Sequence, residues 1–181
     1  MRSKIFTVVG ITCLLLAGIL GVYNYCDDKR VVDSQDKIIE KLENIEEVYV
    51  NPVIEMPEVD VDGVACIGIL EIDGIELRLP VLSECTLDSL KKAPGRFYGS
   101  ANLNNMVIGG HNSRAQFSKL NKLKEGDLIV FTDVVGNVFE YYVSAIEVLD
   151  GNDVDGMLNG WPLTLFMCTY DNLSRYTIRC E

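Results

Sequence analysis

The sequence predicts an all-β fold, an eight-stranded closed barrel with one or two short helices, preceded by a transmembrane helix and a short stalk. Three observations support this prediction. An uncharged, mostly apolar run of nineteen residues, Ile5–Tyr23, lies near the N-terminus, and an acidic segment follows it. Residues 63–181 then hold seven or eight short β-type runs separated by turn residues. These runs do not alternate with long helices, which excludes a doubly wound parallel sheet.

The apolar run is long enough to cross a membrane. As a helix rising ~1.5 Å per residue it would span roughly 28 Å, close to the ~30 Å hydrocarbon layer of a bilayer. We therefore predict a membrane anchor at residues 5–25. A cleaved signal peptide is the alternative, but its apolar core would be about 7–15 residues long and small residues would follow it. Bulky residues such as Tyr23 and Tyr25 stand there instead.

The charges on either side of the run predict its orientation. Arg2 and Lys4 precede the run, whereas Asp27 and Asp28 follow it. Basic flanks stay on the cytoplasmic side, so residues 1–4 are predicted to be cytoplasmic and the folded domain extracellular. The sequence thus predicts a single-pass protein of the plasma membrane.

Residues 26–62 are predicted to form an acidic stalk and linker. Between Asp27 and Asp62 there are twelve acidic and four basic residues, which account for much of the formal net charge of −11. Such a chain is a poor candidate for nucleic-acid binding, since phosphate recognition needs clustered Lys and Arg.

Within the stalk, apolar residues recur at helical spacing if Gln35 fills one slot of the pattern: Val31, Ile38, Leu42, Ile45 and Tyr49. This predicts a short amphipathic helix that could pack on the domain, on a second copy of the chain or on neither. Pro52 and Pro57 end the helical pattern, and the folded domain, residues 63–181, begins near Gly63.

Turn signals and apolar runs predict the elements of residues 63–181. Asp73-Gly74 is a two-residue hairpin signal between the first two strands, and Val135-Gly136-Asn137 marks another turn. Ser113 could cap a short helix that ends near Leu123. Strands are expected at 66–72, 75–81, 106–110, 127–132, 138–149, 163–168 and 175–180, short helices at 86–92 and 113–123, and loops at 94–100 and 150–160.

Six cysteines raise the question of disulfides and metal sites. Cys13 and Cys26 lie in or next to the membrane run, and the others show no C-x-x-C spacing, which argues against structural zinc. Cys66, Cys85 and Cys180 could form a disulfide outside the cell or could be small buried apolar residues. Both readings of these three residues are open at this point.

Three side chains suited to acyl transfer fall where predicted strands meet loops. Cys168 ends the run 163–168, Arg175 begins the last strand, and His111, the chain's one histidine, follows 106–110. Alternation along the strands allows Cys168 and Arg175 to point away from the core on a common side. A rigid sheet can present reactive groups at such positions.

The three residue types together supply the parts of an acyl-transfer reaction. A thiol becomes a nucleophile when it loses its proton near a cationic group. His111 can exchange protons near neutral pH. Arg175 stays charged and can donate hydrogen bonds to a carbonyl oxygen that becomes anionic on attack. The pattern therefore predicts a cysteine transpeptidase.

Residues 66–181 resemble a sortase. The resemblance rests on matched stretches along the whole domain, in the order strand-His, strand-Cys, Arg-strand: Ile67-Gly68-Ile69-Leu70-Glu71-Ile72, Leu79-Pro80-Val81, Asn105-Met106-Val107-Ile108-Gly109-Gly110-His111, Leu120-x-x-Leu-x-x-Gly-Asp127, Leu163-Thr164-Leu165-Phe166-Met167-Cys168 and Arg175-Tyr176-Thr177-Ile178-Arg179. The membrane anchor agrees with it.

The resemblance implies an eight-stranded barrel and a thiol transpeptidase of the Gram-positive cell envelope. Such an enzyme cuts an LPxTG-like sorting signal between Thr and Gly, holds the acyl group as a thioester and passes it to an amine. Its partners would be surface proteins with a C-terminal sorting signal and an acceptor such as a peptidoglycan precursor or a pilin lysine. By position, Cys168 is the nucleophile, His111 the general acid and base, and Arg175 the oxyanion and substrate clamp.

The chain departs from the family pattern at two positions beside these residues. Met167 stands where the family usually has Thr before the cysteine, and Asn112 stands where Arg or Val is common after the histidine. Asn112 and Thr169 are predicted to bind substrate. The short 150–160 connection argues against class B, and the lack of a second apolar run after the domain argues against class C, so an A-, D- or E-like enzyme is expected. We expect no cofactor; some A-class sortases bind calcium, but no calcium ligands can be mapped here.

Other classes of protein fit the residues less well. An L,D-transpeptidase would place its histidine and cysteine in one compact stretch, and a papain-like protease has the cysteine before the histidine. Here His111 and Cys168 are far apart and in the opposite order. A non-enzymatic, membrane-tethered β-barrel binding module is the remaining alternative.

Overall fold

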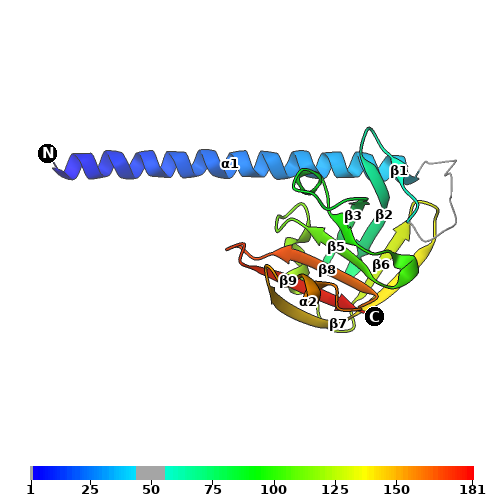
Figure 1. Cartoon of the computed structure of the whole chain (residues 1–181). Helices are drawn as coiled ribbons and strands as arrows, with labels where there is room; N and C mark the ends of the chain where they lie inside the picture. The colour runs from blue at the N-terminus through cyan, green and yellow to red at the C-terminus, as the bar shows by residue number, and fades with distance from the viewer. Residues whose placement is uncertain (1, 44–55) are drawn as a thin grey trace.

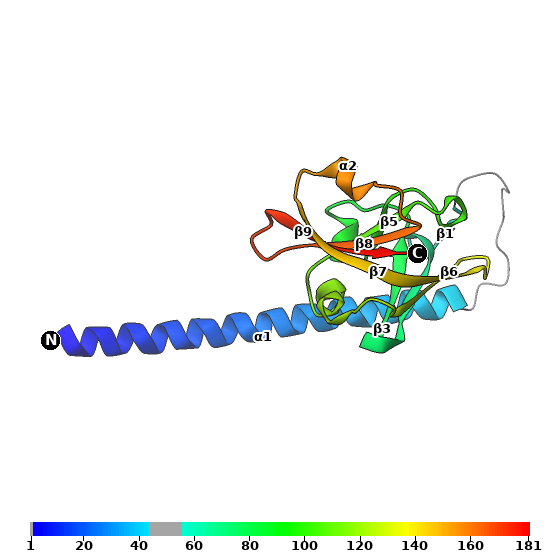
Figure 2. The same ribbon diagram turned by 90° about the horizontal axis from the view of Figure 1, so that it is seen from below.

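The computed structural model of the chain describes residues 2–43 and 56–181. A long helix, α1 (Arg2–Glu43), runs along one side of a β-barrel, and its N-terminal half projects beyond the barrel (Figures 1 and 2). By length and apolar composition this helix could cross a membrane, with a mean hydropathy of 1.7 over its most apolar stretch. One unbroken helix therefore covers the predicted anchor and the first part of the predicted stalk. Ile45, Tyr49 and Pro52 lie outside the described residues.

The described residues form nine strands in one sheet. Its order is β1-β2-β3-β4-β5-β8-β9-β7-β6, and β2 also pairs with β6, which closes a ring of eight strands. Two-residue β1 adds to the edge of β2. The prediction of a closed eight-stranded barrel is confirmed. The strands are β1 (Val59–Asp60), β2 (Ala65–Ile72), β3 (Leu77–Leu82), β4 (Gly95–Tyr98), β5 (Met106–Gly110), β6 (Leu128–Asp133), β7 (Val138–Asp150), β8 (Leu163–Cys168) and β9 (Ser174–Cys180).

The barrel interior is filled by alternate residues of these strands. Along β7, Tyr141 and Val143 are buried while Glu140 and Tyr142 are exposed, because successive side chains of a strand point to opposite faces. Along β8 the inward residues belong to the same core. That core also contains Leu70, Ile108, Phe131, Leu163, Leu165, Met167 and Ile178.

The turn between β2 and β3 differs from its prediction. Ile72 pairs with Leu77, so four residues connect the strands instead of the two expected from Asp73-Gly74. They form a short 3-10 helix, η1 (Asp73–Ile75), and Glu76 adopts a left-handed conformation with φ of 51°. Ile75 belongs to this turn and not to the strand, and its side chain is buried in the main core.

The predicted loop 94–100 contains a strand. Pro94-Gly95 and Gly99 gave a strong turn signal, but β4 is only four residues long and pairs with β5 on one side and with β3 on the other. Gly95 is required there because a side chain would meet the backbone of Glu84, at 2.2 Å from its carbonyl oxygen. Short strands rich in turn residues carry no periodic signal, which explains the miss.

The short helices also differ in detail from their predictions. The two expected ones are 3-10 helices, η2 (Ser89–Lys91) and η4 (Phe117–Lys122), and a further one, η3 (Ala101–Leu103), precedes β5. Gln116, and not Ser113, precedes η4, and no side chain caps it. The predicted loop 150–160 contains α2 (Val154–Met157), which Asp153 caps by accepting a bond from the Gly156 amide at 2.8 Å.

The C-terminal part of α1 packs on the barrel, the first of the three possibilities for the stalk helix. Ile38 joins a small apolar cluster with Val61, Cys66, Leu82 and Ala93. Gln35 is 2% exposed, and its amide donates to the carbonyl of Lys92 at 2.9 Å. Part of the predicted linker is packed as well, since Val61 joins this cluster, Met56 is buried in the main core and β1 pairs with β2. These contacts hold α1 against the domain.

Candidate active site

The strand register brings the three predicted site residues to one edge of the barrel. β5 and β8 are parallel neighbours in which Gly110 lies opposite Met167. The next residues are therefore side by side: His111, just after β5, and Cys168, the last residue of β8. β8 and β9 are antiparallel, and Cys168 lies directly opposite Arg175. Directly opposed residues of such strands have Cα atoms about 4.5–5.5 Å apart. Cys168 therefore sits on the middle strand of three, between the histidine and the arginine.

Alternation along β8 turns Cys168 away from the core. Leu163, Leu165 and Met167 belong to the main core, whereas Phe166 contributes to a separate small cluster on the outer side. Cys168 shares the outward face with Phe166 and is partly exposed. His111 is exposed and Arg175 is partly exposed, so all three side chains are accessible from solvent.

Two glycines bring β5 close to its neighbours just before His111. A side chain on Gly109 would lie 2.7 Å from both Cys85 Sγ and the ring of Phe166. A side chain on Gly110 would lie 2.4 Å from the ring of Phe117. Larger residues would push these groups apart, so the Gly-Gly pair sets the position from which His111 projects.

A buried glutamine holds the backbone of His111. Gln116 is 2% exposed, and its side-chain oxygen accepts a bond from the His111 amide at 2.8 Å. Its Nε2 donates to the carbonyl of Leu90 at 2.8 Å, which ties the loop to η2. The His111 carbonyl accepts bonds from the amides of Ser113 and Phe117. Sequence reasoning missed Gln116, because a single polar residue at the start of a helical segment gives no sign of burial.

The connection between β8 and β9 is a tight turn built on Thr169. The Thr169 amide donates to the Ser174 carbonyl at 3.0 Å, and its hydroxyl accepts from the Ser174 amide at 3.2 Å. The same hydroxyl donates to Asp171, a bond that lowers the pKa of that carboxyl. Thr169 thus fixes the turn between Cys168 and Arg175. Substrate binding by Thr169 and by Asn112, which lines a hollow beside α1, stays a prediction.

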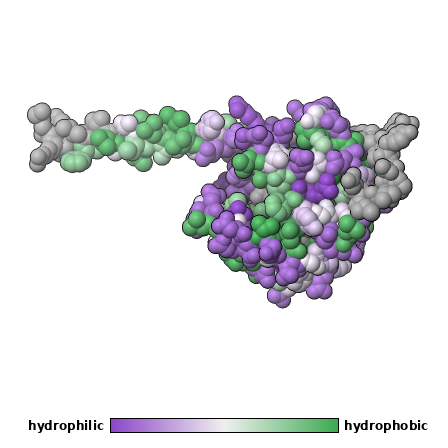
Figure 3. Space-filling model, in the orientation of Figure 1, coloured by the Kyte–Doolittle hydropathy of each residue, from purple (hydrophilic) through white to green (hydrophobic). Residues whose placement is uncertain are grey.

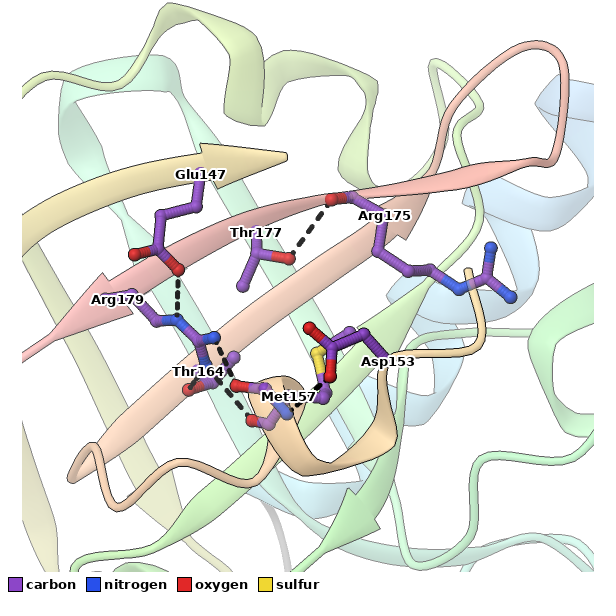
Figure 4. A network of polar contacts seen from close by, with 8 residues as sticks. Glu147, Asp153, Met157, Thr164, Arg175, Thr177 and Arg179 are labelled. Carbon is purple, nitrogen blue, oxygen red and sulfur yellow. Dashed lines mark hydrogen bonds and ion pairs between the residues drawn. The ribbon is translucent and has the colours of Figure 1, made fainter. Parts of the chain in front are cut away.

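Two arginines leave the same face of β9 in different directions. The Nη1 of Arg175 donates to the Ser174 carbonyl at 3.3 Å, and it lies against Gly151 at the end of β7. Figure 4 shows its guanidinium pointing away from the polar network around Arg179. The guanidinium of Arg175 thus lies beside the ends of β7 and β9, and its neighbours there are Ser174 and Gly151.

Arg179 is a buried clamp on the β7–β8 connection. It is 1% exposed and donates to the carbonyls of Met157 at 3.0 Å and Gly156 at 2.6 Å (Figure 4). It also bonds Thr164 Oγ1 at 3.1 Å and pairs with Glu147 at 3.1 Å. α2 is thereby tied to β8 and β9 next to the site. Alternation along β9 puts Arg175, Thr177 and Arg179 on one polar face, but the sequence gives no sign that Arg179 is buried.

A second thiol borders Cys168. The pKa of Cys85 is raised to about 11, mainly by burial. A hydrogen bond from the Gly109 amide opposes the rise, and the neighbouring Cys168 adds to it slightly. Cys85 therefore keeps its proton at neutral pH. All six cysteines are free, and Cys66 and Cys180 are fully buried, as expected of small apolar residues and not of a disulfide.

The arrangement of potential metal-ligating side chains does not support a metal site. In residues 2–43 and 56–181 there is no group of three or more His, Cys, Asp or Glu side chains that could hold a metal ion. The expectation that the protein needs no cofactor stays a prediction.

The chain belongs to the sortase family. The family model described as Sortase domain matches residues 70–181. No significant match is found among curated proteins.

Solved structures agree with this assignment. The barrel is similar to sortase A from Corynebacterium diphtheriae, with 29% identity and a TM-score of 0.58 over 65% of this chain and 60% of that one. It is also similar to the Clostridium perfringens sortase D5 transpeptidase, with 23% identity and a TM-score of 0.61 over 82% and 95% of the two chains. Sortase C1 from Streptococcus suis is similar as well, with 27% identity and a TM-score of 0.57 over 64% of this chain and 72% of that one.

These similarities do not select a class. They are spread over sortases A, C and D with nearly equal TM-scores, so the predicted preference for an A-, D- or E-like enzyme over class C gains no support. The chain spans 60% of the length of the diphtheria structure. At 23% identity, the likeness to the D5 enzyme shows the fold alone.

Proposed function

We propose that this sortase is a membrane-anchored thiol transpeptidase that cleaves an LPxTG-like sorting signal and transfers the acyl group to an amine. The observation that supports it most strongly is the register of β5, β8 and β9, which sets Cys168 between His111 and Arg175. Family membership supplies the reaction class, and the geometry supplies a nucleophile, a proton carrier and a cation on adjacent strands.

The proposed first half-reaction forms a thioester. The Cys168 thiolate attacks the carbonyl carbon of the scissile Thr–Gly bond, and the oxygen takes up negative charge. Arg175 donates hydrogen bonds to that oxygen, which favours the tetrahedral intermediate over the planar substrate. As the C–N bond breaks, the His111 imidazolium gives its proton to the departing amine. The acyl group is left on sulfur, and His111 is neutral.

The second half-reaction returns the enzyme to its starting state. The acceptor amine attacks the thioester carbonyl, and neutral His111 takes the proton that this amine loses. Arg175 again stabilises the oxygen while the C–S bond breaks and the thiolate departs. Exposure of His111 is consistent with this role, since both the leaving and the incoming amine must reach it from solvent.

The proposed location follows from α1 and its flanks. The helix could cross a membrane, and the basic residues before the apolar run with acidic residues after it favour a cytoplasmic N-terminus. The barrel would then be extracellular, where surface proteins with a sorting signal and an amine acceptor are met. A peptidoglycan precursor and a pilin lysine are both chemically suitable acceptors.

The test is turnover of a sorting-signal peptide by the full chain in detergent. Cys168→Ala and His111→Ala are each expected to abolish cleavage without lowering the melting temperature, because neither side chain belongs to the core. Cys85→Ala is the matched control, since it removes a neighbouring thiol whose raised pKa keeps it protonated. Near-normal cleavage by Cys168→Ala would point to a binding module instead of an enzyme.

A further inference from the structure

The connection between β8 and β9 carries two exposed apolar side chains beside the candidate site. Tyr170 is 91% exposed and Leu173 is 70% exposed. The hydrogen bonds of Thr169 and Asp171 keep the turn compact, so that both side chains are held outward. In both ribbon views this connection is the part of the barrel that reaches furthest toward the N-terminal end of α1 (Figures 1 and 2).

The end of the β8–β9 connection, called the β8–β9 tip below, lies at a defined level along α1. Tyr170 lines a hollow of about 660 Å³ whose opposite wall includes Asn24, Asp27 and Asp28 of the helix. These residues directly follow the apolar run that ends at Tyr23. If α1 crosses a bilayer, this is the level at which the helix leaves the hydrocarbon and enters the headgroup layer.

The surface chemistry at this level is that of a membrane interface. Tyr23 and Tyr25 are exposed on the helix, and Tyr is enriched at the boundary between lipid and water. Figure 3 shows the apolar surface of α1 becoming polar where the barrel begins, and an apolar spot on the end of the barrel that faces the projecting helix. Arg114 and Lys122 face the hollow of Tyr170 and can reach lipid phosphates, while Asp27 and Asp28 lie on the opposite wall.

The position of the barrel relative to the helix is held by several contacts. Ile38 packs in the cluster with Val61 and Leu82, and Gln35 bonds the Lys92 carbonyl. Ion pairs join Lys41 to Asp62 and Arg78 to Glu43 nearby. Because the helix is continuous from the apolar run to these contacts, the depth of α1 in a bilayer sets the height of the β8–β9 tip.

We propose that Tyr170 and Leu173 insert into the interfacial region of the same bilayer that α1 crosses. The ligand of this surface is the lipid itself: the Tyr170 ring lies at the interface, Leu173 reaches the upper acyl chains, and Arg114 meets phosphate. Cys168, two residues before Tyr170, then faces the membrane surface. A peptide that emerges from the bilayer is presented to it directly. This inference rests on the proposed membrane anchoring of α1.

The test uses tryptophan fluorescence of the full chain in vesicles of phosphatidylglycerol and phosphatidylcholine, with and without brominated acyl chains. Trp161, the single tryptophan, is replaced by Phe, and one tryptophan is then introduced per variant. Tyr170→Trp and Leu173→Trp report the tip. Leu14→Trp, in the apolar run, reports the membrane span. Val138→Trp is the matched control, because Val138 is 60% exposed at the start of β7. The β6–β7 turn lies on the side of the barrel away from the projecting part of α1 (Figure 1).

The proposal predicts blue-shifted emission and quenching by brominated lipid for both tip variants, weaker than for Leu14→Trp, and none for Val138→Trp. Quenching in Leu14→Trp with tip variants that behave like Val138→Trp would overturn this inference and leave the anchoring intact. Loss of quenching in Leu14→Trp as well would overturn both. If Trp161→Phe is unstable, the same substitutions are made in the native chain and its spectrum is subtracted.

Discussion

The two ends of β9 carry the same residue type on the same face and use it differently. Arg175 lies at the start of the strand, opposite Cys168, with a partly exposed guanidinium. Arg179 lies four residues further along the same face, beyond Thr177, and is 1% exposed. Its hydrogen bonds go to α2, β8 and Glu147. The difference is one of available donors: the buried arginine has its donors engaged, whereas the exposed one can offer them to a substrate.

The comparison predicts its largest effect for Arg175→Lys. A single ammonium cannot reproduce the planar fork that would hold a carbonyl oxygen, so turnover is expected to fall by roughly 10²-fold, the usual cost of one oxyanion donor. The melting temperature should stay the same, because Arg175 makes few contacts. Steady-state peptide cleavage and a thermal scan measure the two quantities. Equal rates for Lys and Arg would remove the proposed clamp.

The opposite pattern is expected for Arg179→Ala. Its loss leaves the carbonyls of Gly156 and Met157 and the hydroxyl of Thr164 without their partner in a buried site. The ion pair itself adds little, because the carboxylate of Glu147 is partly exposed. We expect a loss of about 3 kcal/mol in the free energy of unfolding, measured by urea titration. A variant with unchanged stability but no turnover would reverse the roles assigned to the two arginines.

A smaller loss of stability is expected at alkaline pH from two buried thiols, Cys180 at the end of β9 and Cys66 in β2. Burial raises the pKa of Cys180 to about 12, and burial, followed by the charge of Asp60, raises that of Cys66 to about 12. The unfolded chain loses these protons near pH 9, but the folded chain does not, so both thiols stabilise the fold at neutral pH and lose that effect as pH rises from 9 toward 12. At pH 10 the loss is about 1 kcal/mol per thiol.

Urea titrations between pH 7 and 11 measure this slope. Cys66→Ala lowers the stability at neutral pH by opening a small cavity, but the decline with pH should be shallower in this variant. A decline of the same steepness in Cys66→Ala and in the parent chain would show that this thiol does not titrate as described.

How far the sequence predicts the molecule depends on how local the determining contacts are. β8 was predicted to the residue, because Leu163–Cys168 is a continuous apolar run flanked by Pro162 and a polar turn. The alternation along β9 likewise placed Arg175 and Ile178 on opposite faces. The register of β5 on β8 cannot be read from either strand alone, yet it is what sets His111 beside Cys168.

The missed features depend on contacts between distant segments. β4 is a strand because β3 and β5 flank it, although Gly95 reads locally as a turn. Gln116 supports His111 through Leu90, 26 residues earlier in the chain, and Arg179 is buried by a helical turn that sequence reasoning assigned to a loop. Polar residues of this kind give no periodic signal, so their roles emerge only when the barrel closes.

The most direct measurement of the central claim is the site of the covalent intermediate. The full chain is incubated with a library of pentapeptide sorting signals and quenched in acid. Mass spectrometry of the digested enzyme then identifies the residue that carries the acyl group. We predict a thioester on Cys168, absent from Cys168→Ala and retained in Cys85→Ala. An adduct on Cys85 or any other residue, or cleavage that persists in Cys168→Ala, would contradict the account.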